Sequence, residues 1–138
     1  MELNTPSNRP ISEYKSNRLS DRIVYQAHEG KVLHLDAFRD TRETHLMPAI
    51  LFFHGGGWSA GDTRQFHPFS DFFAERGWMA FCAQYRLINE AITPFDCVAD
   101  AGTALNWLAD HAGDLRIRKD AIVVAGASAG GHLAVCAS

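Results

Sequence analysis

Two glycine-rich segments carry the residue types that acyl-transfer chemistry needs. Residues 126–131 read Gly-Ala-Ser-Ala-Gly-Gly, a G-x-S-x-G pattern in which Ser128 is a candidate nucleophile. Residues 54–58 read His-Gly-Gly-Gly-Trp, and three successive glycines let backbone N–H groups face a ligand. Such N–H groups can stabilise the negative charge that forms on a carbonyl oxygen when a serine attacks it. The pair of segments therefore predicts nucleophilic attack by Ser128 with backbone stabilisation of an oxyanion.

The G-x-S-x-G pattern has a mechanical reason. A serine between a strand and a helix sits on a strained turn, and glycines on either side prevent collisions with neighbouring backbone. A helix that starts at Ser128 directs its N-terminal N–H groups at the reacting oxygen, so the N–H of Ala129 is a candidate donor. By itself the pattern is weak, because average composition produces it in roughly 5% of chains of this length. The rarer His-Gly-Gly-Gly segment strengthens the prediction.

Short apolar runs predict the strands that must position these segments, at 22–27, 31–38, 49–53, 78–83 and 122–125. The first two flank a His-Glu-Gly turn and are expected to form an antiparallel hairpin. The run at 49–53 leads directly into the His-Gly-Gly-Gly segment, and the run at 122–125 leads into the serine turn. Continuous apolar runs of this kind are typical of strands that are covered on both faces.

Helical patterns alternate with these strands. Four phenylalanines at three-to-four spacing predict a helix that packs in the core and ends at Gly77, namely Phe66, Phe69, Phe72 and Phe73. A second helix is expected to begin after Thr93 as N-cap, with Pro94 at its first position and Asp96 closing an acidic capping box. A third helix begins at Ser128. The alternation predicts an α/β protein with a mostly parallel sheet and helices on both faces.

Composition limits the classes of function. The 138 residues suffice for one domain, and we expect a polar segment at 1–20 followed by the domain at 21–138. A net charge of −3 without a dense Lys/Arg cluster argues against nucleic-acid or membrane partners. Residues 1–20 lack the apolar core of a secretory signal, so a cytoplasmic location is expected. Three widely spaced cysteines in apolar stretches are interpreted as buried thiols, and no spacing predicts a metal site.

From about residue 32 to residue 138 the chain resembles the N-terminal half of an α/β-hydrolase of the esterase/lipase group, closest to its hormone-sensitive-lipase-like and feruloyl-esterase-like (BD-FAE-like) branch. The resemblance rests on residues 54–58 with Gly61, on residues 85–87, on Asp100 and Trp107, and on residues 126–133. It implies Ser128 as nucleophile, the N–H groups of Gly56, Gly57 and Ala129 as oxyanion hole, and His54 as support for that loop, with Gly55 the less favoured donor. It also implies a small ester substrate and no cofactor.

The chain departs from the family pattern in two places. Gln84 stands where relatives often carry an acidic residue before the Tyr-Arg pair, which puts the loop anchoring in doubt. The acid and the histidine that complete the catalytic triad in this fold follow the serine, and neither is found here. We therefore expect the sequence to be incomplete, truncated after the helix that follows Ser128, and the 138-residue chain alone to be nearly inactive.

No upstream residue is a good substitute for the missing base. His54, His67 and His111 have the right chemistry, but His67 is expected on the surface and His111 at a helix C-terminus, where it meets the dipole. His132 is expected to face the core in a structural role. Asp62 is expected to cap or anchor its loop.

Several functions remain compatible with these turns. The same constellation serves formamidases, lactonases and peptidases, so the turns do not identify the acyl or leaving group. A chain that ends soon after 122–125 leaves an apolar strand as an open edge, which also allows a non-catalytic truncated product or a half-domain that depends on a partner. The oligomeric state stays open.

Overall fold

A computed structural model describes residues 19–138, and five strands within it form a single sheet. The strands are β1 (Leu19–His28), β2 (Lys31–Phe38), β3 (Met47–Phe53), β4 (Met79–Ala83) and β5 (Ile117–Gly126). Their order across the sheet is β1-β2-β4-β3-β5. Strand β3 pairs in parallel with both β4 and β5, whereas β2 pairs antiparallel with β1 and β4. The sheet is thus a parallel unit extended by an antiparallel hairpin.

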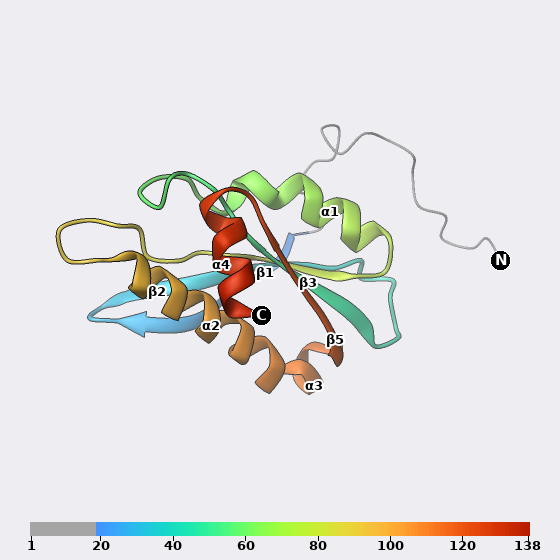
Figure 1. Cartoon of the computed structure of the whole chain (residues 1–138). Coiled ribbons are helices and arrows are strands. Elements are labelled where there is room, and N and C mark those ends of the chain that lie inside the picture. Colours follow the sequence, from blue (N-terminus) through green and yellow to red (C-terminus); the bar gives the residue numbers. More distant parts are fainter. Residues whose placement is uncertain (1–18) are drawn as a thin grey trace.

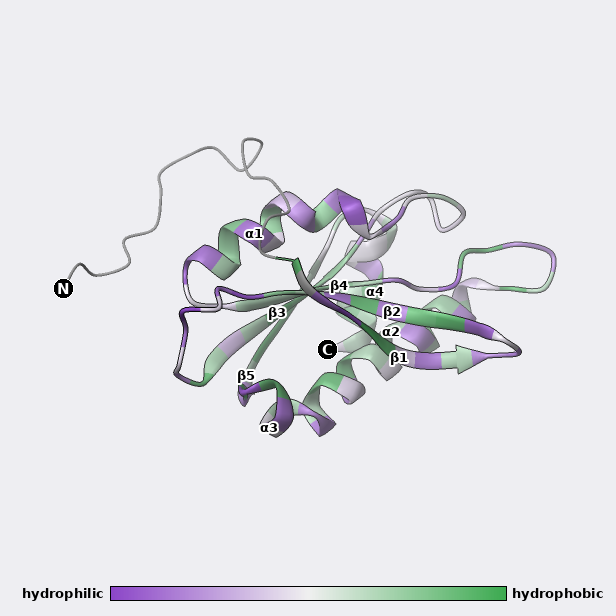
Figure 2. Ribbon diagram, turned by 180° about the vertical axis from the view of Figure 1, so that it is seen from behind, coloured by the Kyte–Doolittle hydropathy of each residue, from purple (hydrophilic) through white to green (hydrophobic). Residues whose placement is uncertain are grey.

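Helices cover both faces of this sheet (Figure 1). They are the 3-10 turn η2 (Thr63–Phe66) and the helices α1 (His67–Glu75), α2 (Pro94–Asp110), α3 (Ala112–Leu115) and α4 (Ala129–Ala137). Helix α1 packs on β4 and β2, and α4 packs on β5, β3 and α2. Seen from behind, α1 lies on one side of the strands and α2 with α3 on the other (Figure 2). The α/β layering matches the sequence-based expectation.

The β1–β2 hairpin closes through Glu29 and Gly30. Both residues have positive φ, 43° and 84°, as a two-residue turn of the type that matches strand twist requires. His28 pairs with Lys31 on either side of the turn. The predicted hairpin is confirmed, although β1 begins at Leu19 and not at residue 22, as predicted.

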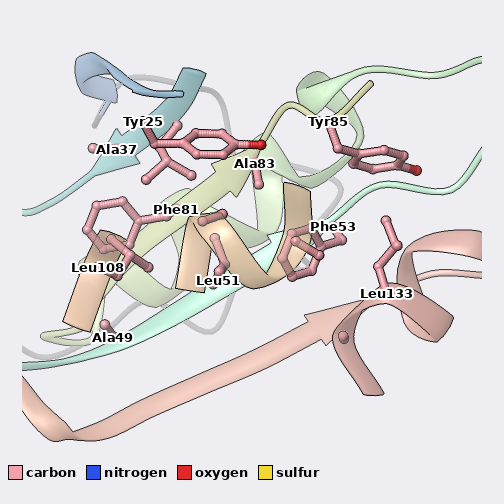
Figure 3. Close-up of a cluster of buried hydrophobic side chains, with 14 of the residues drawn as sticks. Tyr25, Ala37, Ala49, Leu51, Phe53, Phe81, Ala83, Tyr85, Leu108 and Leu133 are labelled. Atoms are coloured by element: carbon pink, nitrogen blue, oxygen red, sulfur yellow. The ribbon is translucent and has the colours of Figure 1, made fainter. Parts of the chain in front are cut away.

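Alternation along the strands divides the apolar side chains into two layers. The larger layer lies under α2 and α4 and includes Leu51, Phe53, Phe81 and Leu133 (Figure 3). The smaller layer lies under α1, where Phe52 stacks on Phe66 with ring centroids 4.7 Å apart. Not all of the predicted phenylalanine stripe is core, because Phe69 at the margin of this layer remains 36% exposed.

The cap of α2 and the edge position of β5 agree with expectation, although β5 begins at Ile117 and not at residue 122. Thr93 caps α2 through a capping box in which its backbone N–H donates to Asp96 Oδ2 at 2.8 Å. Strand β5 is one of the two outer strands of the described sheet, and its Val123 is 45% exposed. An apolar strand at an open edge was the arrangement expected.

The cysteines follow the prediction only in part. Cys82 and Cys97 are buried, but Cys136 is exposed, so its assignment as a buried thiol is wrong. Helix α4 turns Leu133 and Ala134 into the core and leaves Cys136 on its outer face. Within residues 19–138, no helix is long and apolar enough to cross a membrane, and no cluster of His, Cys, Asp or Glu is arranged to hold a metal ion.

Candidate active site

The two glycine segments meet at the carboxyl ends of two parallel strands. Parallel strands β3 and β5 end in register, with Phe53 paired to Gly126, so the turns that follow them are neighbours. A Cβ added to Gly55 would lie 2.8 Å from Ala127 O and 3.5 Å from the Cβ of Ser128. The structure therefore brings the predicted oxyanion turn against the predicted nucleophile.

Ser128 occupies a strained backbone conformation at the start of α4. Its φ and ψ are 53° and −118°, a region that non-glycine residues rarely adopt, and the residue is exposed. The glycines on either side are required by close packing. A Cβ on Gly126 would lie 2.2 Å from Gly130 O, and one on Gly130 would lie 2.0 Å from Phe53 O. The turn can form because the residues two before and two after the serine carry no side chains.

The predicted oxyanion turn, which follows β3 and begins at His54, has left-handed backbone at three successive residues. The φ values of Gly56, Gly57 and Trp58 are 138°, 64° and 73°. The turn closes through Gly56 O, which accepts the N–H of Ala60 at 3.0 Å. No acceptor among residues 19–138 takes the N–H of Gly56 or Gly57, nor that of Ala129. These three donors remain available to a ligand.

The N–H of Gly55, in contrast, is occupied. It donates to Gln65 Oε1 at 2.6 Å, which agrees with its ranking as the less favoured donor. The sequence analysis did not identify Gln65. No motif marks this residue, since it lies on a 3-10 turn and meets Gly55 only in the folded chain.

His54 lies inside the loop rather than beside the serine. It is buried, its ring stacks on Tyr85 at 4.4 Å, and its Nδ1 lies 2.8 Å from Gly55 O. Burial lowers the pKa of His54, although the hydrogen bond to Gly55 and the charge of Asp62 oppose this effect. Because a carbonyl oxygen only accepts, Nδ1 carries the proton and donates. The Tyr85 hydroxyl donates to His54 O at 2.6 Å.

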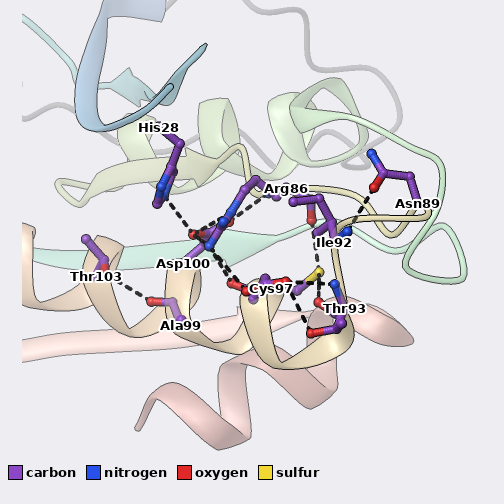
Figure 4. Close-up of polar contacts among 10 residues, drawn as sticks. His28, Arg86, Asn89, Ile92, Thr93, Cys97, Ala99, Asp100 and Thr103 are labelled. Carbon is purple, nitrogen blue, oxygen red and sulfur yellow. Dashed lines mark hydrogen bonds and ion pairs between the residues drawn. The ribbon is translucent and has the colours of Figure 1, made fainter. Parts of the chain in front are cut away.

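Arg86, three residues after β4, ties this part of the chain to α2 (Figure 4). Arg86 forms a bidentate pair with the fully buried Asp100, with Nε to Oδ2 and Nη2 to Oδ1 both at 2.9 Å. The backbone N–H of Arg86 donates to the same carboxylate at 2.9 Å. At the atypical position, Gln84 Oε1 accepts the N–H of His34 at 3.1 Å, so Gln84 anchors this loop to β2.

Two histidines lie where the sequence did not place them. His67 was expected on the surface but is buried, with Nε2 2.8 Å from Asp36 Oδ2, because β2 turns Asp36 toward α1. His132 was expected to face the core but is exposed, with its ring 5.6 Å from that of Trp58 in an edge-on contact.

Two other polar residues behave as expected. His111 is the C-cap of α2 and contacts Trp107 O at 2.8 Å through Nδ1. Asp62 is the N-cap of η2 and accepts the N–H of Arg64 at 2.9 Å. In the described part of the chain, no histidine or carboxylate hydrogen-bonds to the Ser128 hydroxyl.

The chain is similar to known esterases and lipases. The BD-FAE family model matches residues 35–138. The probable carboxylic ester hydrolase LipM of Mycobacterium tuberculosis is 35% identical over 112 residues, a match that covers 79% of this chain and 26% of LipM. Lipase 2 of a Moraxella species is 41% identical over 90 residues, covering 62% of this chain and 20% of the lipase.

A solved structure matches most of the chain. The esterase Est2 of Thermogutta terrifontis with propionate bound superposes with a TM-score of 0.82 at 37% identity, covering 88% of this chain and 46% of Est2. The chain thus spans about a quarter of the length of LipM and just under half of the length of Est2. It belongs to the BD-FAE family and forms the N-terminal portion of an α/β-hydrolase esterase fold.

Proposed function

We propose that the protein is a serine hydrolase that cleaves carboxylic esters, with Ser128 as nucleophile and the N–H groups of Gly56, Gly57 and Ala129 as oxyanion hole. One observation carries the proposal. The strained serine turn lies against a glycine turn, and the N–H groups of Gly56, Gly57 and Ala129 in these turns have no acceptor within residues 19–138. A site of this kind is suited to an oxygen that becomes negatively charged.

In the proposed reaction Ser128 Oγ bonds to the ester carbonyl carbon while its proton passes to a base, and the carbonyl oxygen takes the negative charge. Collapse of this intermediate breaks the bond to the alcohol oxygen, which receives that proton, and leaves an acyl-enzyme. Water then attacks the acyl carbon and gives a proton to the base, the bond from the acyl carbon to Ser128 Oγ breaks, the carboxylic acid leaves, and Oγ takes the proton back from the base. The described residues place no base at Ser128, so the proposal requires one from outside them.

The substrate class is proposed from the solved relatives. Est2 structures hold propionate or butyrate, and Est2 is phosphorylated by paraoxon. We therefore propose a small ester with a short acyl chain, cleaved without a cofactor. A cytoplasmic location is proposed as well, consistent with the free thiols of Cys82 and Cys97.

The test is covalent labelling of the protein expressed from its complete gene. A fluorophosphonate should label the wild type at Ser128, should not label Ser128→Ala, and should abolish hydrolysis of p-nitrophenyl butyrate. Persistent labelling or turnover in Ser128→Ala would reject the nucleophile. The 138-residue chain alone should hydrolyse this ester no faster than its Ser128→Ala version, because its residues 19–138 place no base at the serine.

A further inference from the structure

We infer that Gln65 is a positioning residue of the oxyanion turn, and that its side chain determines which glycine N–H groups face the substrate. The inference deepens the proposed function and rests on it. Gln65 touches neither the nucleophile nor a reacting atom in this arrangement. It acts on the backbone of Gly55, through the 2.6 Å hydrogen bond from that N–H to its Oε1.

Two successive peptide planes in the turn are held by side chains. The plane between His54 and Gly55 is held at both ends, since Tyr85 donates to its carbonyl oxygen at 2.6 Å and its N–H donates to Gln65. The next plane joins Gly55 to Gly56, and its carbonyl oxygen is held by His54 Nδ1 at 2.8 Å. A trans peptide directs its N–H opposite to its carbonyl. Fixing Gly55 O therefore aims the N–H of Gly56 away from His54.

Gln65 is itself held in place from both sides along the chain. Two residues before it, the Thr63 hydroxyl donates to Asp36 Oδ2 at 2.6 Å, and two residues after it, His67 Nε2 lies 2.8 Å from the same oxygen. Arg22 Nε donates to the other oxygen of Asp36 at 2.8 Å. The buried carboxylate on β2 thus anchors both ends of the short segment that presents Gln65 to Gly55.

Loss of the Gln65 amide leaves the buried Gly55 N–H without an acceptor. Burying an unsatisfied donor is unfavourable, and glycine backbone rotates with little steric resistance, so the plane between His54 and Gly55 is expected to turn. Rotation of that plane changes the direction of the following one and with it the N–H of Gly56. We therefore expect the loss of the amide to weaken stabilisation of the transition state, in which the oxyanion forms, and to leave substrate binding nearly unchanged.

The test compares Gln65→Met with Gln84→Met in the protein expressed from its complete gene. Both substitutions remove an exposed glutamine whose Oε1 accepts a backbone N–H, but Gln84 accepts from His34 on β2 and not from a glycine of the turn. With p-nitrophenyl butyrate, Gln65→Met should lower kcat by about ten- to a hundredfold, with KM within about twofold. Gln84→Met should keep kcat within about twofold of the wild type.

The outcomes separate this inference from the proposed function. Equal kcat in the wild type and Gln65→Met, with Ser128→Ala inactive, would overturn the role of Gln65 and leave the nucleophile intact. A similar loss in both glutamine variants would also overturn it. If the wild type shows no turnover that depends on Ser128, the proposed function fails. Amide hydrogen exchange at Gly55 then tests the tether alone, with slow exchange in the wild type supporting it and fast exchange rejecting it.

Discussion

Gly55 and Ser128 pack against each other with no space for a side chain on the glycine, since a Cβ there would lie 2.8 Å from Ala127 O and 3.5 Å from the serine Cβ. Gly55 follows β3 and Ser128 follows β5, so the two residues lie far apart in the sequence. The contact exists because β3 and β5 are parallel neighbours that end in register. The close approach also explains why Gly55 is buried while Gly56 and Gly57, which follow it, are exposed.

The two exposed glycines should respond differently to alanine. Gly56→Ala should lower kcat about a hundredfold, because its Cβ would lie 2.0 Å from Ala60 O and the turn must distort. Gly57→Ala should lower kcat far less, since no atom lies within 4 Å of its Cβ and a φ of 64° costs alanine only about 1–2 kcal/mol. Steady-state kinetics on the protein expressed from its complete gene measure both effects. Equal losses would contradict the steric argument.

Gly130→Ala should destabilise the fold by about 3 kcal/mol or more, because the added Cβ would lie 2.0 Å from Phe53 O in the contact between α4 and β3. Gly102→Ala is the matched control. Gly102 lies within α2 with open space around its Cβ, so alanine should stabilise the protein by about 0.5–1 kcal/mol. Urea unfolding monitored by circular dichroism measures both. A harmless Gly130→Ala would contradict the close approach.

Asp36 should make stability depend on pH in the acid range. Burial alone would raise the pKa of Asp36, but the hydrogen bonds from His67, Thr63 and Arg22 outweigh it and lower the pKa from 3.8 to about 2. A depressed carboxyl pKa stabilises the fold above the unfolded pKa, here by about 2 kcal/mol. That contribution is present above pH 3.8 and is lost as the pH falls to about 2.

The measurement is urea unfolding between pH 6 and pH 2 for the wild type and Asp36→Asn. The difference in unfolding free energy should be largest near pH 6 and should shrink as Asp36 becomes protonated in the wild type. Asp120→Asn serves as control, since its side chain is 76% exposed and should show little difference at any pH. A difference for Asp36 that does not change with pH would contradict the assignment.

Arg86→Lys should destabilise the protein by about 1–3 kcal/mol despite keeping the charge. Lysine cannot make the bidentate pair that Arg86 forms with Asp100, whose carboxylate is fully buried. Arg118→Lys, in an exposed pair with Asp120, should change stability by less than about 0.5 kcal/mol. Thermal unfolding distinguishes the two substitutions, and equal effects would show that the buried pair contributes no more than a surface pair.

The local features of the chain were determined by its sequence, because they depend on neighbours within a few residues. The Glu29-Gly30 turn, the capping box from Thr93 to Asp96 and the Asp62 cap follow from the conformations that these side chains favour. The strained serine turn was predicted in the same way, and Gly126 is needed in it because an added Cβ would lie 2.2 Å from Gly130 O, four residues along the chain.

Contacts between distant segments were decided only by the tertiary structure. Helix α1 covers the face of the sheet toward which Asp36 points. Asp36 therefore contacts His67 of that helix, and His67 is buried and not exposed. His132 faces outward because α4 packs its Leu133 side into the core. Gln65 reaches Gly55 only because η2 is anchored on β2. Such pairings depend on strand order and register, which no local pattern in the sequence encodes.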